Sequence, residues 1–155
     1  MKNKTVALWL TLVVGPLGLH RMYVRGRYDA LSMALISATL VGLYGLYRAR
    51  SLGVDDQISW LLIPFLGFTL AGCALNALVY GVMSAESWNS RFNPTAPAES
   101  PQGETGRWTV AGLITALFLG TTVLMATLAF TFQRYFEYQA EAAHIPPLVI
   151  KKSAN

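Results

Sequence analysis

The run ISWLLIPFLGFTLAGCALNALVYGVM, residues 58–83, contains no charged side chain. An α-helix needs about 20 apolar residues to cross the hydrocarbon core of a bilayer, because each residue advances it by only about 1.5 Å. The run is longer than that. No water pairs the backbone amides and carbonyls inside a bilayer, so only a helix or a closed barrel satisfies them. The run therefore predicts a membrane-spanning helix.

On either side of this run, three further segments are apolar enough to predict spans: 5–23, 30–47 and 109–132. The four segments together predict an all-α fold, a polytopic transmembrane helical bundle with four spans. The first segment is the shortest, because its apolar part ends at Leu19. Residues from His20 to Tyr23 must complete the crossing, or the bilayer must thin locally. Lys2 and Lys4 also fit the start of a signal peptide, but no small-x-small cleavage site follows, so we expect the segment to be retained.

The composition is typical of a membrane protein. Hydrophobic residues make up 54% of the 155-residue chain and charged residues 13%, which is about half the charged share of an average soluble domain. The net charge of +4 comes from Lys and Arg that flank apolar segments, so we expect membrane anchoring and no nucleic acid partner. The single cysteine, Cys73, excludes an internal disulfide and a multi-cysteine metal site.

Small residues recur at every fourth position in three of the four segments. Such stripes let helix backbones approach closely, so they predict a tight bundle or self-association. The predicted packing residues are Ala30, Ala34, Ala38 and Gly42 in the second segment, Cys73, Ala77 and Gly81 in the third, and Gly112, Ala116 and Gly120 in the fourth.

The chain divides into three regions by composition. Residues 1–83 hold the first three apolar segments. Residues 84–107, SAESWNSRFNPTAPAESPQGETGR, are rich in Pro, Ser and Glu and predict a mobile aqueous linker. Residues 108–155 hold the fourth transmembrane helix and a polar tail, in which Pro146 and Pro147 end the helix.

The connection GPLGLHRMYVRGRYD, residues 15–29, holds the densest basic cluster of the chain. Pro16 and two glycines predict a bend at the end of the first helix, Gly26 allows a tight turn, and Asp29 is placed to cap the next helix. Two interpretations of the cluster stay open: interfacial anchors without a specific partner, or a site for an anionic lipid head group or a partner's acidic segment. The candidate contact residues are His20, Arg21, Tyr23, Arg25 and Arg27.

The same stretch resembles the signature of the TM2 domain family of small membrane proteins. The resemblance covers roughly residues 2–66 and implies a pair of transmembrane helices joined by a short linker. Met22 and Pro64 depart from the family pattern, and the additional residues 48–57 imply an extra span within residues 1–83. The family implies no defined biochemical activity. The residues that carry the resemblance are Lys4, Val6-Ala7-Leu8, Gly15, Gly18-Leu19-His20-Arg21, Tyr23 and Arg27.

Candidate catalytic and metal-binding groups are few and scattered. The only other histidine besides His20 is His144, and one imidazole does not make a metal site. Asp55 and Asp56 follow Arg48, which favours a solvated or helix-capping role for the two carboxylates. The chain has no Ser-His-Asp set, phosphate-binding loop or zinc-protease motif. We therefore expect no enzymatic activity, no cofactor and no metal.

Two functional hypotheses follow from these patterns. The first is a non-enzymatic interaction or scaffolding module, which acts by close helix packing, including self-association, and recognises anionic lipid head groups or a membrane protein partner through the basic cluster. The alternative is a small homo-oligomeric pore or an accessory subunit of a transporter, with Asn76 as its deepest polar residue; otherwise Asn76 makes a helix–helix hydrogen bond. We expect a multi-pass protein of the cytoplasmic or inner membrane if the source is bacterial. Four spans divide the basic residues almost evenly, so the charge rule only weakly favours a cytoplasmic position for residues 20–29.

Overall fold

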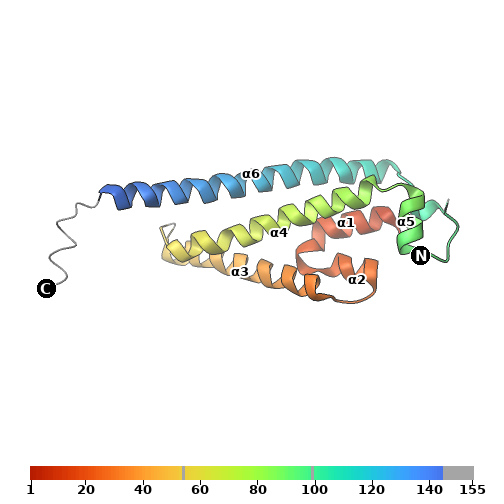
Figure 1. The fold of residues 1–155 in the computed structure, drawn as a ribbon, viewed down its shortest axis with the longest axis horizontal. Helices are drawn as coiled ribbons and strands as arrows, with labels where there is room; N and C mark the ends of the chain where they lie inside the picture. Colours follow the sequence, from red (N-terminus) through yellow and green to blue (C-terminus); the bar gives the residue numbers. More distant parts are fainter. Residues whose placement is uncertain (54, 99, 145–155) are drawn as a thin grey trace.

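The structure is a computed structural model that describes residues 1–144 except 54 and 99. Within these residues every regular element is a helix (Figure 1), which confirms the predicted all-α fold. The tail from residue 145, including the two prolines expected to end the last helix, lies outside the described residues. In chain order the elements are α1 (Lys4–Val14), the 3₁₀ turn η1 (Gly15–Leu17), α2 (Leu19–Arg25), α3 (Ala30–Leu52), α4 (Gln57–Val82), α5 (Ala85–Phe92), the 3₁₀ turn η2 (Pro101–Gly103) and α6 (Arg107–His144).

Three of these helices, α3, α4 and α6, are long and apolar enough to cross a membrane. The first predicted span, residues 5–23, is not among them. Helix α1 ends at Val14 after 11 residues, which rise about 16 Å, roughly half of a hydrocarbon core of about 30 Å. The chain then reverses at η1, and α2 runs back beside α1 (Figure 1). The segment is thus a helical hairpin, the α1–α2 hairpin, and not one straight helix.

The reversal follows from the residues of the turn. Gly18 has φ 70°, a left-handed backbone conformation that residues with a side chain rarely adopt. The Gly18 amide donates to the Gly15 carbonyl at 2.8 Å, and the Thr39 hydroxyl of α3 donates to the Pro16 carbonyl at 3.0 Å. These backbone carbonyls are therefore paired within the protein, so the turn needs no water to satisfy them.

Helix α4 is central, because α3, α6 and the α1–α2 hairpin all pack against it. The small-residue stripes predicted for α4 and α6 lie in these contacts. Gly120 faces Ala74 so closely that a Cβ atom at residue 120 would lie 2.8 Å from the Ala74 Cβ. The buried stripe residues are Cys73, Ala77 and Gly81 on α4, and Gly112 and Ala116 on α6.

The stripe predicted for α3 packs only at one end. Gly42 lies against Leu66 of α4, whereas Ala30 and Ala34 are exposed and Ala38 is half-buried. A helix has about 3.6 residues per turn, so each four-residue step rotates by about 40° and Gly42 lies about 120° around the axis from Ala30. The face that α3 buries instead carries Ser32, Thr39, Gly42 and Gly45.

Helix α5 and the turn η2, which lie within the predicted linker 84–107, fold against the bundle, although the composition of this region predicted a mobile linker. Trp88 of α5 is fully buried, with its ring centroid 5.8 Å from that of Tyr80 and 4.4 Å from that of Phe92. Asn89 is also fully buried, and its Nδ2 donates to the Ser100 carbonyl at 2.9 Å. We call α5 and η2 together the α5 cap.

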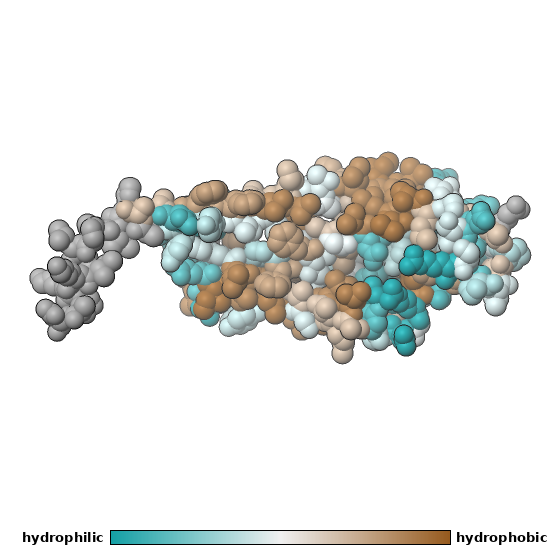
Figure 2. Space-filling model, viewed as in Figure 1, coloured by the Kyte–Doolittle hydropathy of each residue, from teal (hydrophilic) through white to brown (hydrophobic). Residues whose placement is uncertain are grey.

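The surface separates apolar sides from polar ends. Figure 2 shows hydrophobic residues along the long helices and hydrophilic residues gathered toward the ends. Large side chains such as Leu61 (71% exposed) and Phe118 (69% exposed) point outward from α4 and α6. A soluble monomer rarely exposes apolar surface on this scale. The three apolar helices and this surface are compatible with a membrane protein.

Candidate functional site

The candidate site lies at one end of the bundle, which we call the basic end. It holds the N-terminus, α2, the turn between α2 and α3, the α5 cap and the start of α6 (Figure 1). The opposite end holds the turn between α3 and α4, where Arg134 of α6 lies 3.7 Å from Asp55. The hairpin decides this arrangement, because it returns the chain to the end at which it began.

His20 lies inside the bundle and not at the surface. It is fully buried, and its Nε2 is 3.3 Å from Nδ2 of Asn76 in α4. With the amide nitrogen as donor, Nε2 is the acceptor of this hydrogen bond. Asn76 therefore bonds to another helix, which is one of the two roles predicted for it. The prediction that His20 contacts lipid or a partner is wrong, because the hairpin turns this side chain inward.

Arg21 and Asp29 form a doubly hydrogen-bonded ion pair across the turn between α2 and α3. Arg21 Nε donates to Oδ1 at 2.8 Å, and Nη2 donates to Oδ2. The carboxylate also accepts from Arg25 Nη1 at 2.8 Å and from the Ser32 amide at 3.0 Å. Arg21 above all, together with the Ser32 side chain and amide, holds the pKa of Asp29 well below its usual range. Asp29 caps α3 as predicted.

Tyr23 and the α5 cap fix the N-terminal segment. The Asn3 amide donates to the Tyr23 hydroxyl at 2.9 Å. Trp88 Nε1 donates to the Lys2 carbonyl at 2.9 Å, and Asn93 Nδ2 donates to the same carbonyl at 3.0 Å. The indole and the amide therefore attach the first residues of the chain to the cap.

The basic side chains of this end differ in what they contact. Lys4 is fully buried, and its Nζ donates to the Met83 carbonyl at 2.9 Å and to the Thr105 hydroxyl at 2.7 Å. Its charge is thus directed into the protein. The basic side chains that remain exposed at this end are Arg25, Arg27, Arg91 and Arg107.

The predicted contact set therefore divides in two. His20, Arg21 and Tyr23 hold the hairpin in place, and of the set only Arg25 and Arg27 are exposed. Exposed guanidinium groups offer positive charge and several hydrogen-bond donors, which suits phosphate or carboxylate ligands.

A second Arg–Asp pair lies at the opposite end, and it was not predicted. Arg48 Nε donates to Asp56 Oδ2 at 2.6 Å, and Nη2 donates to Oδ1 at 3.0 Å. The Ser59 amide donates to the same carboxylate at 3.0 Å, so Asp56 caps α4. These donors, Arg48 first, lower the pKa of Asp56 to about 2. The sequence carries the signal, because Arg-x₄-Gly-x₂-Asp-x₂-Ser occurs at 21–32 and again at 48–59.

Among the described residues, no group of three or more His, Cys, Asp or Glu side chains could hold a metal ion. No protein-family model, no curated protein and no solved structure matches the chain.

Proposed function

We propose that the chain is an integral membrane protein in which α3, α4 and α6 span the bilayer, while the α1–α2 hairpin enters and leaves it at the basic end. Three observations support this arrangement over four spans. Helix α1 has half the length of a span. The turn at Gly15 lies against Cys73, well inside α4. The carbonyls of that turn are paired within the protein.

The hairpin also supports an orientation. With four spans, Lys2 and Lys4 would lie on the opposite side from Arg21, Arg25 and Arg27. With a re-entrant hairpin all five lie on one side, and basic residues near the membrane favour the cytoplasmic side. The basic residues of this end are Lys2, Lys4, Arg21, Arg25, Arg27, Arg91 and Arg107; those of the opposite end, within the described residues, are Arg48, Arg50 and Arg134.

The function that this geometry supports best is non-enzymatic: recognition of anionic phospholipid head groups of the cytoplasmic leaflet by the basic end. The observation that carries it is the set of exposed guanidinium groups, Arg27, Arg91 and Arg107, around one end of the bundle. A basic residue near an anionic membrane surface contributes about 1 kcal/mol, so three contribute about 3 kcal/mol, on the order of a hundredfold in affinity. We also propose membership of the TM2 domain family, in which the signature residues would form the hairpin.

Lipid retention tests this function. The protein is reconstituted in vesicles of equal parts phosphatidylcholine and phosphatidylglycerol, extracted gently, and analysed by native mass spectrometry. We expect wild type to retain phosphatidylglycerol preferentially, and the triple variant Arg27→Gln, Arg91→Gln, Arg107→Gln to lose most of it. The control is Arg50→Gln, an exposed arginine of the opposite end, which should retain the lipid. Equal retention by the triple variant and wild type would rule the function out.

The orientation has a separate test. Single cysteines replace Arg27 and Arg50 in turn, and intact cells are treated with a membrane-impermeant maleimide. We expect labelling at residue 50 and protection at residue 27, whereas Cys73 is buried and serves as the unreactive background. Labelling at residue 27 would show that the basic end faces outward, whatever lipid it retains.

A further inference from the structure

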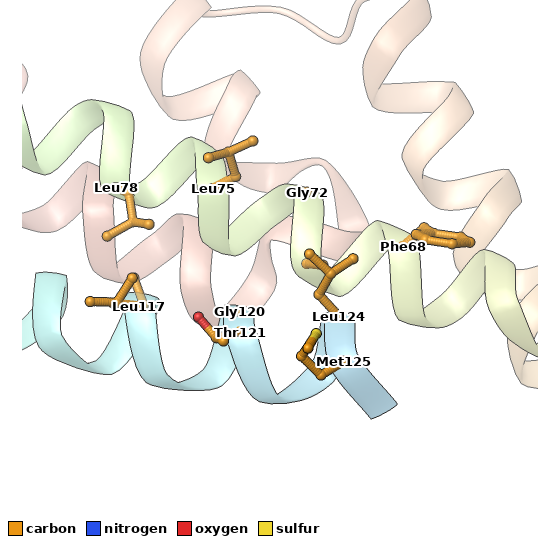
Figure 3. Close-up of a pocket in the computed structure, with 11 residues that line it drawn as sticks. Phe68, Gly72, Leu75, Leu78, Leu117, Gly120, Thr121, Leu124 and Met125 are labelled. Atoms are coloured by element: carbon orange, nitrogen blue, oxygen red, sulfur yellow. The ribbon is translucent and has the colours of Figure 1, made fainter. Parts of the chain in front are cut away.

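We propose that a second copy of this chain packs along the outer face of α4, with Gly72 at the point of closest approach. The proposal rests on the membrane placement of α4 and α6 proposed above and is independent of lipid head-group recognition. It starts from a groove between α4 and α6, of about 420 Å³, whose lining is apolar except for the Thr121 hydroxyl. Figure 3 shows Leu78 and Leu117 at one end of the groove and Phe68 and Met125 at the other.

No close contact within a single chain explains why residue 72 is a glycine. Each of the other glycines inside α3, α4 and α6 has a neighbour so close that a Cβ atom would lie less than 3 Å from it. At Gly72 a Cβ atom would meet nothing within 4 Å. Glycine is the least favourable residue in a helix after proline, and in membrane helices it is typical of positions where a second backbone approaches closely. Close approach of a helix from outside the chain explains the glycine at position 72.

The residues around Gly72 form a continuous outward-facing seam. From Leu61 to Val82, the exposed residues of this seam follow one another at alternating steps of four and three positions. This is the heptad spacing of helices that pack side by side. From Leu61 to Val82 the seam rises about 32 Å, the thickness of the whole hydrocarbon core. A single acyl chain belongs to one leaflet, about half that length, so a helix fits the seam better than a lipid does. Between these two ends the exposed seam residues are Phe65, Phe68, Gly72, Leu75 and Val79.

The seam is complementary to itself. Leu75, 64% exposed, projects one helical turn from Gly72, beside the hollow between α4 and α6. In a two-fold dimer Leu75 of each copy enters the groove of the other, because such an interface uses the same patch twice. Two copies inserted in the same orientation place their α4 helices in parallel, as this symmetry requires. The seam carries no charged residue that would select a different partner.

Crosslinking in native membranes tests the proposal. Leu75→Cys should give a disulfide-linked dimer on mild oxidation. Leu119→Cys should not, although residue 119 is exposed and lies at the same depth, next to Gly120, which faces Ala74. Wild type, whose Cys73 is buried, measures the background. Equal crosslinking at residues 75 and 119 would mean random collision and would overturn the proposal.

A second measurement uses substitutions that leave the fold intact. Gly72→Leu adds a side chain where the single chain has open space, so the variant should fold but lose the dimer in nanodiscs. Ala34→Leu adds similar bulk on the exposed face of α3 and should keep it. A wild-type monomer, or a dimer lost with Ala34→Leu and kept with Gly72→Leu, would contradict the proposal. Resistance to carbonate extraction is measured on the same samples, so failure to insert is told apart from failure to dimerise.

Discussion

The turn before α3 and the turn before α4 lie at opposite ends of α3 and have the same construction. In each, an arginine of the preceding helix pairs with the aspartate that caps the next helix, and a glycine with positive φ lies between them. Their surroundings differ. The turn before α3 connects a short hairpin to the bundle, whereas the turn before α4 connects two long helices that already pack along their length. The same ion pair should therefore contribute more to holding the hairpin against the bundle than to holding α3 against α4.

The burial of the two arginines follows this difference. The Arg21 side chain is 9% exposed and that of Arg48 is 25% exposed. Asp29 has a second arginine partner, Arg25, at 2.8 Å. We infer that the first turn is a structural requirement of the hairpin, and that the second adds stability to a pair of helices that would associate without it.

Replacing the two arginines tests this comparison most directly. Arg21→Gln removes charged hydrogen bonds from a mostly buried pair, so it should lower the free energy of unfolding by about 2 kcal/mol. Arg48→Gln should lower it less, because α3 and α4 keep their other contacts. Unfolding by sodium dodecyl sulfate in mixed micelles, followed by circular dichroism, measures both. An equal or larger loss for Arg48→Gln would show that the Arg21–Asp29 pair contributes no more to stability than the Arg48–Asp56 pair.

Substitution of the two glycines should reverse this order, with the larger loss of stability at the turn before α4. Gly26 has φ 75° and ψ 4°, a left-handed conformation that costs another residue about 1 kcal/mol. Gly53 has φ 98° and ψ 165°, a region used almost only by glycine, at a cost of about 1–3 kcal/mol for another residue. A Cβ atom meets nothing within 4 Å at either position, so Ala substitutions compare backbone strain alone. The thermal midpoint should fall more for Gly53→Ala than for Gly26→Ala.

Asparagine sharpens this test, because it tolerates the left-handed conformation better than other residues with a side chain. Gly26→Asn should restore most of the stability that Gly26→Ala loses. Gly53→Asn should restore none of it. Rescue at both positions would mean that the two glycines share one conformation in solution.

The comparison also indicates which features of the fold can be predicted from sequence patterns. Apolar runs predicted α3, α4 and α6, because length and hydrophobicity are local properties. They did not predict the reversal at Gly15–Gly18, since a short apolar run with a bend fits either a kinked span or a hairpin. Only contacts with distant residues, such as the hydrogen bond from Thr39 to Pro16, distinguish the two. His20 was misplaced for the same reason, because its environment depends on the direction in which α2 returns.

The smallest expected difference between the turns lies in their response to acid. Both aspartates have a folded-state pKa below the unfolded value of about 3.9, so each contributes stability that is present above about pH 4 and is lost as the pH falls through its folded pKa. That pKa is about 2 for Asp56 and lower still for Asp29. Asn keeps the helix cap, so comparing wild type with Asp56→Asn and with Asp29→Asn isolates the charge. The difference in thermal midpoint should shrink to near zero by about pH 2 for Asp56→Asn and persist at that pH for Asp29→Asn. General acid effects act on all three proteins alike, so loss of both differences at the same pH would show that the folded-state pKa of Asp29 is no lower than that of Asp56.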